Sequence, residues 1–245
     1  MGSGDARQVF EQAFKNNLWG DADSRSGPGS SLAQTRTVRE RLPALLARYG
    51  IGEMLDAPCG DFFWMREIIS EINAIPCVYN GADIVEDLVK DNNAKYGNER
   101  VRFLHLNLIE ERVPRVDLVL TRDCFLHLSC ANVLKILQNY RAAGVKYVLV
   151  STYSKPDRVN ADVDGFSVPG RVLNMQNYPF LFPPPLDVIV EGCTESDGGH
   201  ADKSLALWRR EDLPLDRIAV SVRTMFAHDF YWRVRRKLGR MLRGR

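Results

Sequence analysis

Segments typical of β-strands alternate with segments typical of α-helices from residue 53 to residue 153 of this chain. Strands that are connected through helices pair in parallel, and the connecting helices cover both faces of the resulting sheet. The expected strands span residues 53–57, 77–82, 101–106, 116–121 and 146–153, and the expected helices span residues 62–72, 85–96 and 133–143.

Two more strand-like segments, 186–191 and 204–209, follow without a helix between them. Strands that are not separated by a crossover helix can pair in an antiparallel manner. The sequence therefore predicts an α/β fold with a doubly wound, mostly parallel seven-stranded sheet that has an antiparallel edge.

The first 50 residues depart from this alternation. After a polar beginning, glycine, proline and serine in residues 21–31 exclude a regular helix or strand. Apolar residues at steps of three and four then predict a helix from residue 32 until Gly50. We expect residues 1–50 to form a helical cap joined by a flexible loop, and residues 51–230 to form the main domain.

A long irregular connection, residues 154–185, interrupts the domain before its last two strands. It is rich in proline and glycine but also contains Tyr178, Phe180 and Phe182. Irregular connections of this length inside a domain are commonly lids or binding loops. Disorder is the alternative, but the aromatic residues favour a lid or binding loop.

Composition excludes several classes of protein. Of the 245 residues, 45% are hydrophobic and 26% are charged, which is typical of a folded domain and not of a disordered chain. No apolar run approaches the roughly 18 residues of a membrane span, and the first residues do not resemble a secretory signal, so we expect a cytoplasmic protein. Five cysteines without a Cys-x-x-Cys pair predict neither a disulfide framework nor a metal site.

The charge is unevenly distributed along the chain. Residues 231–245 contain seven basic residues and no acidic one, which leaves 26 Lys and Arg against 31 Asp and Glu in residues 1–230. Apolar residues in this tail recur at helical spacing, so it is typical of a basic amphipathic helix. The pattern suits peripheral contact with an anionic membrane or an acidic partner, and a frayed end is the alternative. Without aromatic stacking residues it does not predict nucleic-acid binding.

The segment from Leu55 to Phe62 connects the first expected strand to the first helix and reads Leu-Asp-Ala-Pro-Cys-Gly-Asp-Phe. Ligands of open α/β sheets bind beyond the carboxyl ends of the strands, and small residues there allow close approach of the backbone. Because the Gly-x-Gly-x-x-Gly pattern is missing, a dinucleotide is disfavoured. Asp83 ends the next strand, 23 residues beyond Gly60, where a carboxylate can bind the ribose hydroxyls of a nucleotide or merely cap the following helix.

Three segments together resemble the class I S-adenosylmethionine-dependent methyltransferases. They are residues 56–61, residues 81–83, and residues 117–123 followed by His127 and Leu128. The Asp-Ala-Pro-Cys-Gly-Asp-Phe-x-Trp-Met motif and the preceding Ser-Gly-x-Gly-Ser loop are similar to a bacterial subgroup of phosphoramidate and glycan O-methyltransferases that act on surface polysaccharides. The resemblance spans roughly residues 19–209 and implies a Rossmann-like methyltransferase fold with S-adenosylmethionine as cofactor.

The resemblance also implies roles for single residues. Asp56, Gly60 and Asp61 would surround the methionine end of the cofactor, and Asp83 would bind its ribose. For the adenine ring, the implied contacts are Asn107 at the amino group and Ile84 and Leu108 on the two faces, although both apolar residues equally suit the core. Pro58 stands where the wider family more often has glycine and removes one backbone donor.

Three polar residues follow the fourth expected strand, where the transferred methyl group should point. His127 has a suitable pKa for a general base, and Asp123 is expected to act as the base or to orient it; the alternative for His127 is a packing or capping role. Arg122 is expected to hold a carboxylate of the cofactor or acceptor, or else to pair with Asp123 or another acid.

The remaining candidates lie in the two irregular segments. In the early segment, the expected cofactor contacts are Trp19, Arg25, Ser26 and Gly27. Beside or within residues 154–185, the expected acceptor contacts are Tyr153, Asp162, Arg171 and Asn174. His200 is expected to be an exposed turn residue.

Taken together, the sequence predicts a methyltransferase that methylates an oxygen of a small or glycan-linked acceptor, either a sugar hydroxyl or a phosphoramidate, in the metabolism of the bacterial envelope or capsule. The alternative is a non-catalytic, cofactor-binding scaffold protein that is recruited through its basic tail.

Overall fold

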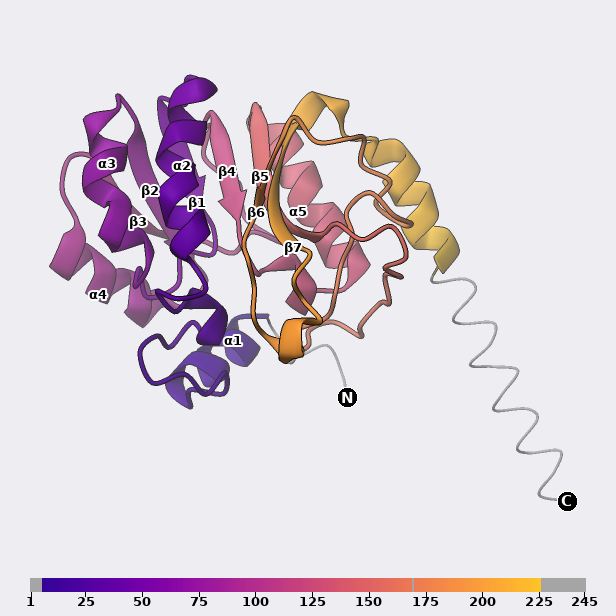
Figure 1. Ribbon diagram of the computed structural model, residues 1–245, viewed down its shortest axis with the longest axis horizontal. Coiled ribbons are helices and arrows are strands. Elements are labelled where there is room, and N and C mark those ends of the chain that lie inside the picture. Colours follow the sequence, from indigo (N-terminus) through magenta and orange to yellow (C-terminus); the bar gives the residue numbers. More distant parts are fainter. Residues whose placement is uncertain (1–5, 169, 226–245) are drawn as a thin grey trace, which may run out of the picture.

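The computed structural model describes residues 6–168 and 170–225, and it contains a seven-stranded sheet in the order β3-β2-β1-β4-β5-β7-β6 (Figure 1). Strands β1 to β5 pair in parallel, whereas β7 lies between β5 and β6 and is antiparallel to both. The predicted fold class and the antiparallel edge are thereby confirmed. The strands are β1 (Glu53–Asp56), β2 (Val78–Asp83), β3 (Val101–His105), β4 (Leu118–Thr121), β5 (Tyr147–Tyr153), β6 (Asp187–Val190) and β7 (Lys203–Arg209).

Helices cover both faces of the sheet because the strands alternate their apolar side chains between two cores. In β4, Leu118 and Leu120 belong to the core beneath α2, α3 and α4, whereas Val119 belongs to the core beneath α5 and the helical residues 215–225. This period of two is the geometry of a strand that is buried on both sides. The helices are α1 (Ala6–Lys15), α2 (Arg36–Arg48), α3 (Ile69–Ala74), α4 (Glu86–Tyr96) and α5 (Cys130–Ala143).

The helix expected at residues 62–72 begins later than predicted. Phe62 has φ of 58° and is fully buried against Tyr79 and Phe103, so the chain turns sharply there instead of entering a helix. A short 3₁₀ turn, Met65–Ile68, then leads into α3. Aromatic packing at the turn has therefore overridden the helical pattern.

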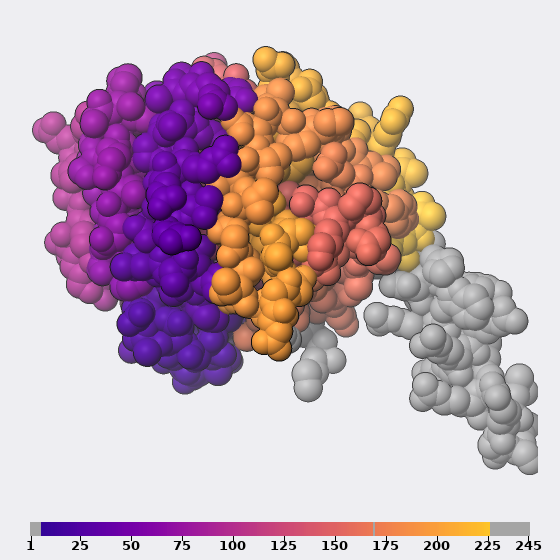
Figure 2. Space-filling model, viewed as in Figure 1, coloured from indigo at the N-terminus to yellow at the C-terminus, as the bar shows by residue number. Residues whose placement is uncertain are grey.

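The N-terminal segment contains a helix where the sequence predicts only a polar beginning. Helix α1 buries Ala6 and Ala13, and its Arg7 bonds to Glu86 of α4 at 3.0 Å. Figure 2 shows the indigo N-terminal residues covering one end of the molecule beside the orange segment that carries β6 and β7. The segment before α2 thus consists of an α-helix and an irregular part that lie across the ends of several strands. The helix predicted from residue 32 to Gly50 is present as α2.

The described residues of the 154–185 connection form no regular helix or strand. Asn160 accepts a bond from the Asn174 amide (2.7 Å) and donates to the Asn174 and Tyr178 carbonyls. Phe180 is fully buried, and Phe182 packs against Trp208 of β7. The connection is therefore held to the body by its own aromatic side chains.

Two further predictions concern the membrane. None of the helices in the described part of the chain has the length and hydropathy needed to cross a bilayer. The basic tail predicted at residues 231–245 lies outside the described residues, so its proposed contact with an anionic surface stays a prediction.

Candidate functional site

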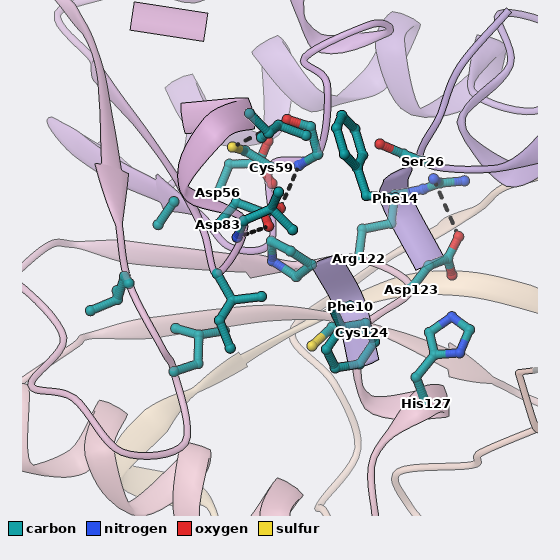
Figure 3. A pocket seen from close by; sticks show the side chains of 18 of the residues that line it. Phe10, Phe14, Ser26, Asp56, Cys59, Asp83, Arg122, Asp123, Cys124 and His127 are labelled. Carbon is teal, nitrogen blue, oxygen red and sulfur yellow. Dashed lines mark hydrogen bonds and ion pairs between the residues drawn. The ribbon is translucent and has the colours of Figure 1, made fainter. Parts of the chain in front are cut away.

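A pocket lies beyond the carboxyl ends of β1, β2 and β4, where Asp56, Asp83 and Arg122 project into it (Figure 3). It measures about 1140 Å³ with the space at its open mouth included. Of the sequence candidates, the pocket brings together Trp19, Arg25, Ser26, Asp56, Pro58, Gly60, Asp83, Ile84, Asn107, Leu108, Arg122, Asp123 and His127. Gly27, Asp61, Tyr153, Asp162, Arg171 and Asn174 do not line it.

Gly60 occupies the turn after β1 and has no room for a side chain. Its φ is 56°, in the left-handed region, and a Cβ there would lie 2.1 Å from the Ser26 hydroxyl. Its amide donates to the Asp83 carboxylate at 3.1 Å. Glycine at this position therefore lets the N-terminal segment close directly over the turn.

Asp83 ends β2, and its carboxylate connects that strand to the turn after β1 and to the start of α4. One carboxylate oxygen accepts the Gly60 amide, and the other accepts the Val85 amide at 3.0 Å, just before α4. The side chain is only 8% exposed, and this burial raises the pKa of Asp83 above its usual value. Each oxygen keeps a second lone pair. Asp83 therefore steadies the entry to α4 and can still accept bonds from a diol in the pocket.

Asp56 ends β1 and is 2% exposed. The Tyr79 hydroxyl donates to its carboxylate at 2.8 Å. Burial raises the pKa of Asp56 to about 7, although the Tyr79 bond and the charge of Arg122 partly oppose that rise. The carboxyl is thus half-protonated near neutral pH, and a cationic group in the pocket would favour its charged form.

Asp61 has a different position from the one that the resemblance implies. Its carboxylate lies outside the pocket lining and accepts bonds from the Ser24 hydroxyl, the Ser26 hydroxyl and the Arg25 amide, at 2.9–3.1 Å. In return, the Asp61 amide donates to the Ser26 hydroxyl. In the described structure, Asp61 is the residue that fastens residues 24–26 over the pocket.

Aromatic side chains of the N-terminal segment form the roof of the pocket. Trp19 packs edge-on against His127, with ring centroids 6.2 Å apart, and its buried indole Nε1 has no bonding partner among the described residues. Gly27 has φ of 96° and packs directly against Trp19, where a side chain would not fit, because a Cβ at Gly27 would lie 2.9 Å from the Trp19 Cβ. The sequence prediction missed Phe10 and Phe14, which line the pocket from α1 and whose four-residue spacing puts them on one helical face.

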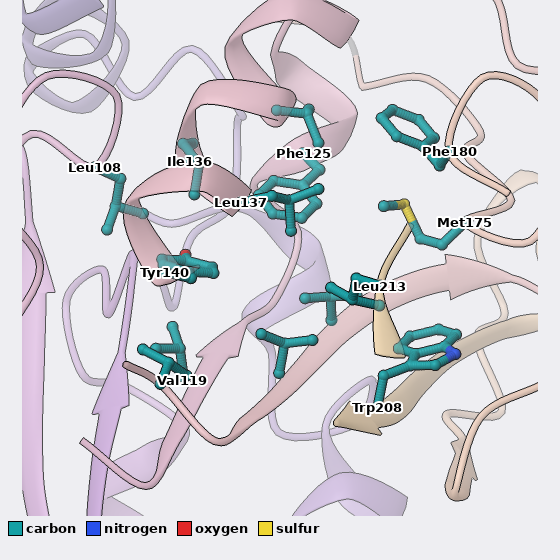
Figure 4. Close-up of a cluster of buried hydrophobic side chains, with 14 of the residues drawn as sticks. Leu108, Val119, Phe125, Ile136, Leu137, Tyr140, Met175, Phe180, Trp208 and Leu213 are labelled. Carbon is teal, nitrogen blue, oxygen red and sulfur yellow. The ribbon is translucent and has the colours of Figure 1, made fainter. Parts of the chain in front are cut away.

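The far end of the pocket is mainly apolar. Ile84 and Leu108 line it, and Leu108 also packs against Ile136 and Tyr140 of α5, so it belongs to the core as well (Figure 4). Asn107 bonds locally, because its side-chain oxygen accepts the Ile109 amide at 3.0 Å and its nitrogen donates to Glu110. This end therefore offers an apolar slot with one amide at its rim.

Four charged residues, the buried Arg122, Glu191 and Lys203 and the half-buried Asp123, form a network beside the pocket. Arg122 bonds to Glu191 at 2.7 Å and lies 3.3 Å from Asp123, while Lys203 bonds to Asp123 at 2.6 Å and lies 3.7 Å from Glu191. Arg122 also donates to the Gly29 carbonyl of the N-terminal segment at 2.8 Å. Arg122 therefore pairs with acidic residues of the protein, which is one of its two expected roles; the other is to hold a carboxylate of a ligand. The buried Nε of Arg122 has no partner within the described ranges.

The surroundings of Asp123 do not favour its expected role as a general base. Burial alone would raise the pKa of Asp123, but Lys203 and Arg122 hold it well below its usual range. A carboxylate that two neighbouring cations hold in its charged form is a weak proton acceptor. Asp123 therefore acts as a fixed anion within the network, and Lys203 and Glu191 are members that the sequence did not single out.

His127 keeps the properties of a general base. Its Nδ1 lies 2.8 Å from the Ser167 carbonyl oxygen, which can only accept, so Nδ1 carries the proton and Nε2 has a free lone pair in the neutral ring. Burial lowers the pKa of His127 below its usual value, against the effect of the Ser167 bond. The ring is thus neutral at physiological pH and oriented by the 154–185 connection.

The four expected acceptor contacts separate into two groups. Asn174 is buried, its side chain donates to the Lys155 carbonyl, and Asp162 accepts the Cys130 amide at the start of α5, so both stabilise the connection. Tyr153 is buried against the His200 ring. Arg171 is different, because its buried Nε and Nη1 have no partner in the described structure and Asp162 is 4.0 Å away.

The comparisons with known proteins identify the fold. No family model and no curated protein matches the chain. The Burkholderia thailandensis 1,6-didemethyltoxoflavin-N1-methyltransferase, solved with that compound and S-adenosylhomocysteine, matches with TM-score 0.53 and 18% identity over 83% of this chain and 86% of that one. Human N-acetylserotonin methyltransferase, solved with S-adenosylmethionine, gives 0.48 and 14%, over 83% of this chain and 55% of that one. The chain thus has the Rossmann-like fold of its methyltransferase neighbour from Burkholderia.

Proposed function

We propose that this protein is an S-adenosylmethionine-dependent methyltransferase. The observation that carries the proposal is the pair of buried carboxyls, Asp56 and Asp83, which flank the Gly60 turn at the carboxyl ends of adjacent parallel strands. In open α/β sheets this is the position of a nucleotide-type ligand. The Burkholderia neighbour of the same fold was solved with S-adenosylhomocysteine, which supports this cofactor.

The side chains of the pocket match the parts of that cofactor. The free lone pairs of Asp83 suit the ribose hydroxyls, and the slot of Ile84 and Leu108 suits the adenine ring. At the other end, Asp56 suits the methionine ammonium group. The unpartnered Nε of Arg122 and Nε1 of Trp19 are buried donors that require an acceptor, and the methionine carboxylate would provide one.

When bound, the cofactor supplies a methyl group that is activated for displacement by its attachment to a positively charged sulfur. The contribution of the protein is then to align the acceptor oxygen and to exclude water. The roof formed by Phe10, Phe14 and Trp19 serves the second purpose, since it covers the pocket with aromatic surface. His127 lies at the edge of this roof, and its Nε2 would take the proton of an acceptor hydroxyl.

We further propose that the acceptor is a small or glycan-linked molecule and that the methyl group goes to oxygen, in envelope or capsule metabolism. Arg171 supports an acceptor with an anionic group. Arg171 lies four residues after Ser167, whose carbonyl oxygen orients His127. The backbone amide of Arg171 donates to the carbonyl of Leu126, the residue before His127. A buried guanidinium with two unpaired nitrogens is matched best by a phosphate-like or carboxylate group.

Two measurements on the purified chain test these proposals. Calorimetry with S-adenosylhomocysteine should show one binding site, and the absence of binding would overturn the cofactor assignment. Transfer from isotopically labelled S-adenosylmethionine should then be assayed on paired envelope sugars with and without a phosphate or phosphoramidate group. Binding without transfer to any of them would favour the non-catalytic scaffold. Arg171→Gln should reduce transfer to the anionic sugars more than to the neutral ones, with the exposed Arg48→Gln as control.

A peripheral membrane role for residues 231–245 is a separate proposal, which rests on the seven basic residues in that segment. The full chain should sediment with vesicles that contain anionic lipid at low salt and should be released by added salt. A chain that ends at residue 230 should remain in the supernatant. Equal sedimentation of the two chains would remove this proposal and leave the catalytic one intact.

A further inference from the structure

The loop between β6 and β7 brings together three side chains that ligate metals. Among the described residues, Cys193, Glu195 and His200 form a group whose sulfur, carboxylate oxygen and imidazole nitrogen all lie within 4.8 Å of one another. Cys193 is buried and unpaired by any disulfide, and its sulfur lies 3.5 Å from a Glu195 oxygen. The group is distinct from the pocket, whose lining contains none of these residues.

The loop backbone accounts for this convergence. Gly192 has φ of 72°, and three successive residues, Ser196, Asp197 and Gly198, have φ between 51° and 80°. Three left-handed residues in a row reverse the chain within a single turn, so His200 returns to the level of Cys193. The His200 ring is further held edge-on against Tyr153, with centroids 5.3 Å apart.

The set of donor atoms selects the kind of metal. A thiolate and an imidazole favour zinc and similar borderline metals, whereas magnesium and calcium prefer oxygen alone. In a tetrahedral zinc site, metal–ligand bonds of about 2.0–2.3 Å separate the ligand atoms by about 3.3–3.8 Å. The sulfur–oxygen distance already matches that value. A side-chain rotation at His200, which is half-buried and bonded only weakly to Ser196 at 3.5 Å, would bring in the third ligand.

We propose that Cys193, Glu195 and His200 bind a zinc ion in the β6–β7 loop. On binding, the Cys193 sulfur loses its proton to solvent and forms a bond to the metal, and the fourth position stays open to water or an external ligand. The proposal does not depend on the methyltransferase assignment, because none of the three residues belongs to the cofactor pocket.

The position of the loop gives the ion a structural consequence. Thr194 bonds to Gln34 twice, at 2.7 and 3.3 Å, just after the N-terminal segment that roofs the pocket. On the other side, the loop begins at Glu191, which holds Arg122. A metal at Cys193, Glu195 and His200 would therefore fix the loop that joins the roof to the buried charge network.

Cobalt is the probe, because Co²⁺ occupies zinc sites and absorbs visible light. The reduced full-length chain, stripped with a chelator, should bind one Co²⁺ with the intense visible bands of a tetrahedral site and a near-ultraviolet thiolate-to-metal band. Added Zn²⁺ should remove both signals. Cys193→Ser should abolish the thiolate band, and His200→Gln and Glu195→Gln should each weaken binding about tenfold or more.

The matched control is His105→Gln, which removes an exposed histidine of β3 outside the group and should leave the spectrum unchanged. Circular dichroism establishes that each variant is folded. A Co²⁺ spectrum without a thiolate band, or one that Cys193→Ser leaves unchanged, would overturn the proposal.

Discussion

The Gly60 amide donates to the Asp83 carboxylate across 3.1 Å and so connects the turn after β1 to the end of β2. The second Asp83 oxygen holds the Val85 amide, which leads into α4. The orientation of this carboxylate is therefore set by the backbone of two neighbouring segments before any ligand arrives. A ligand diol then meets a preorganised acceptor.

We expect Asp83→Ala to weaken S-adenosylhomocysteine binding about 10- to 100-fold, because two hydrogen bonds to a charged group are lost. Calorimetry measures the change, and Asp91→Ala on the exposed face of α4 serves as the control. Thermal melting must accompany the titration, since the Gly60 and Val85 amides lose their partner. An unchanged affinity in a folded variant would eliminate the ribose site.

Gly60→Ala should displace the N-terminal segment. The new methyl group would clash with the Ser26 hydroxyl at 2.1 Å, in addition to the cost of a left-handed φ. Gly50→Ala separates the two effects, because Gly50 has φ of 61° and a Cβ added there would meet nothing within 4 Å. We expect Gly60→Ala to lose about 1–3 kcal/mol more stability than Gly50→Ala and to bind cofactor more weakly. Equal losses would show that residues 24–26 do not press on the turn.

Asp56 should make stability depend on pH in an unusual direction. Burial raises the pKa of Asp56 to about 7 in the folded protein, whereas an aspartate in the unfolded chain titrates near pH 4. Between about pH 4 and pH 7, the folded state therefore holds a proton that the unfolded state has released. The contribution of Asp56 to the free energy of unfolding therefore increases as the pH falls from 7 to 5 and decreases as the pH rises from 5 to 7. Relative to Asp56→Asn, the wild type should gain about 2–3 kcal/mol over that interval in urea unfolding. Parallel pH profiles would contradict the raised pKa.

His127→Ala should reduce transfer to a neutral hydroxyl about 10²- to 10⁴-fold without changing cofactor affinity. The wild-type rate should rise with pH through a pKa below 6.5 and then become constant, since only the neutral ring accepts a proton. His105→Gln is the control for loss of an unrelated imidazole. Full turnover in His127→Ala would reduce this residue to a packing partner of Trp19.

Glu191→Ala should destabilise the fold by about 3–5 kcal/mol, because Arg122 loses its closest partner while it stays buried. The double variant Arg122→Met with Glu191→Ala removes both charges and should cost less than the sum of the two single changes. Chemical unfolding of all four proteins measures the coupling. Additive losses would mean that the 2.7 Å contact contributes nothing to stability.

Periodicity and turn composition were sufficient to predict the sheet and many of the residues that line the pocket. Alternating apolar residues, as in β4, define buried strands, and the ends of parallel strands must share one edge of the sheet. The short helix after Phe62 was misplaced because the packing of that ring against Tyr79 and Phe103 arises only from distant strands.

Long-range pairing accounts for the remaining differences. The sequence suggests Asp123 as a base because its partner Lys203 lies 80 residues away along the chain, and nothing in the sequence indicates that the two residues pair. In the same way, the motif around Asp61 predicts a contact with a ligand. In the structure, the hydroxyls of Ser24 and Ser26 donate to Asp61 instead, and their segment has no periodicity from which its position could be predicted. Spacing along a chain does not encode which charges neutralise one another.

Phe10 of α1 packs edge-on against Phe166 of the 154–185 connection, with ring centroids 5.7 Å apart. The cover of the proposed cofactor site thus touches the segment that orients His127. If one ligand shifts Phe10 and another shifts Phe166, this contact couples the two binding events. Thermodynamic reciprocity then requires each ligand to change the affinity for the other by the same factor.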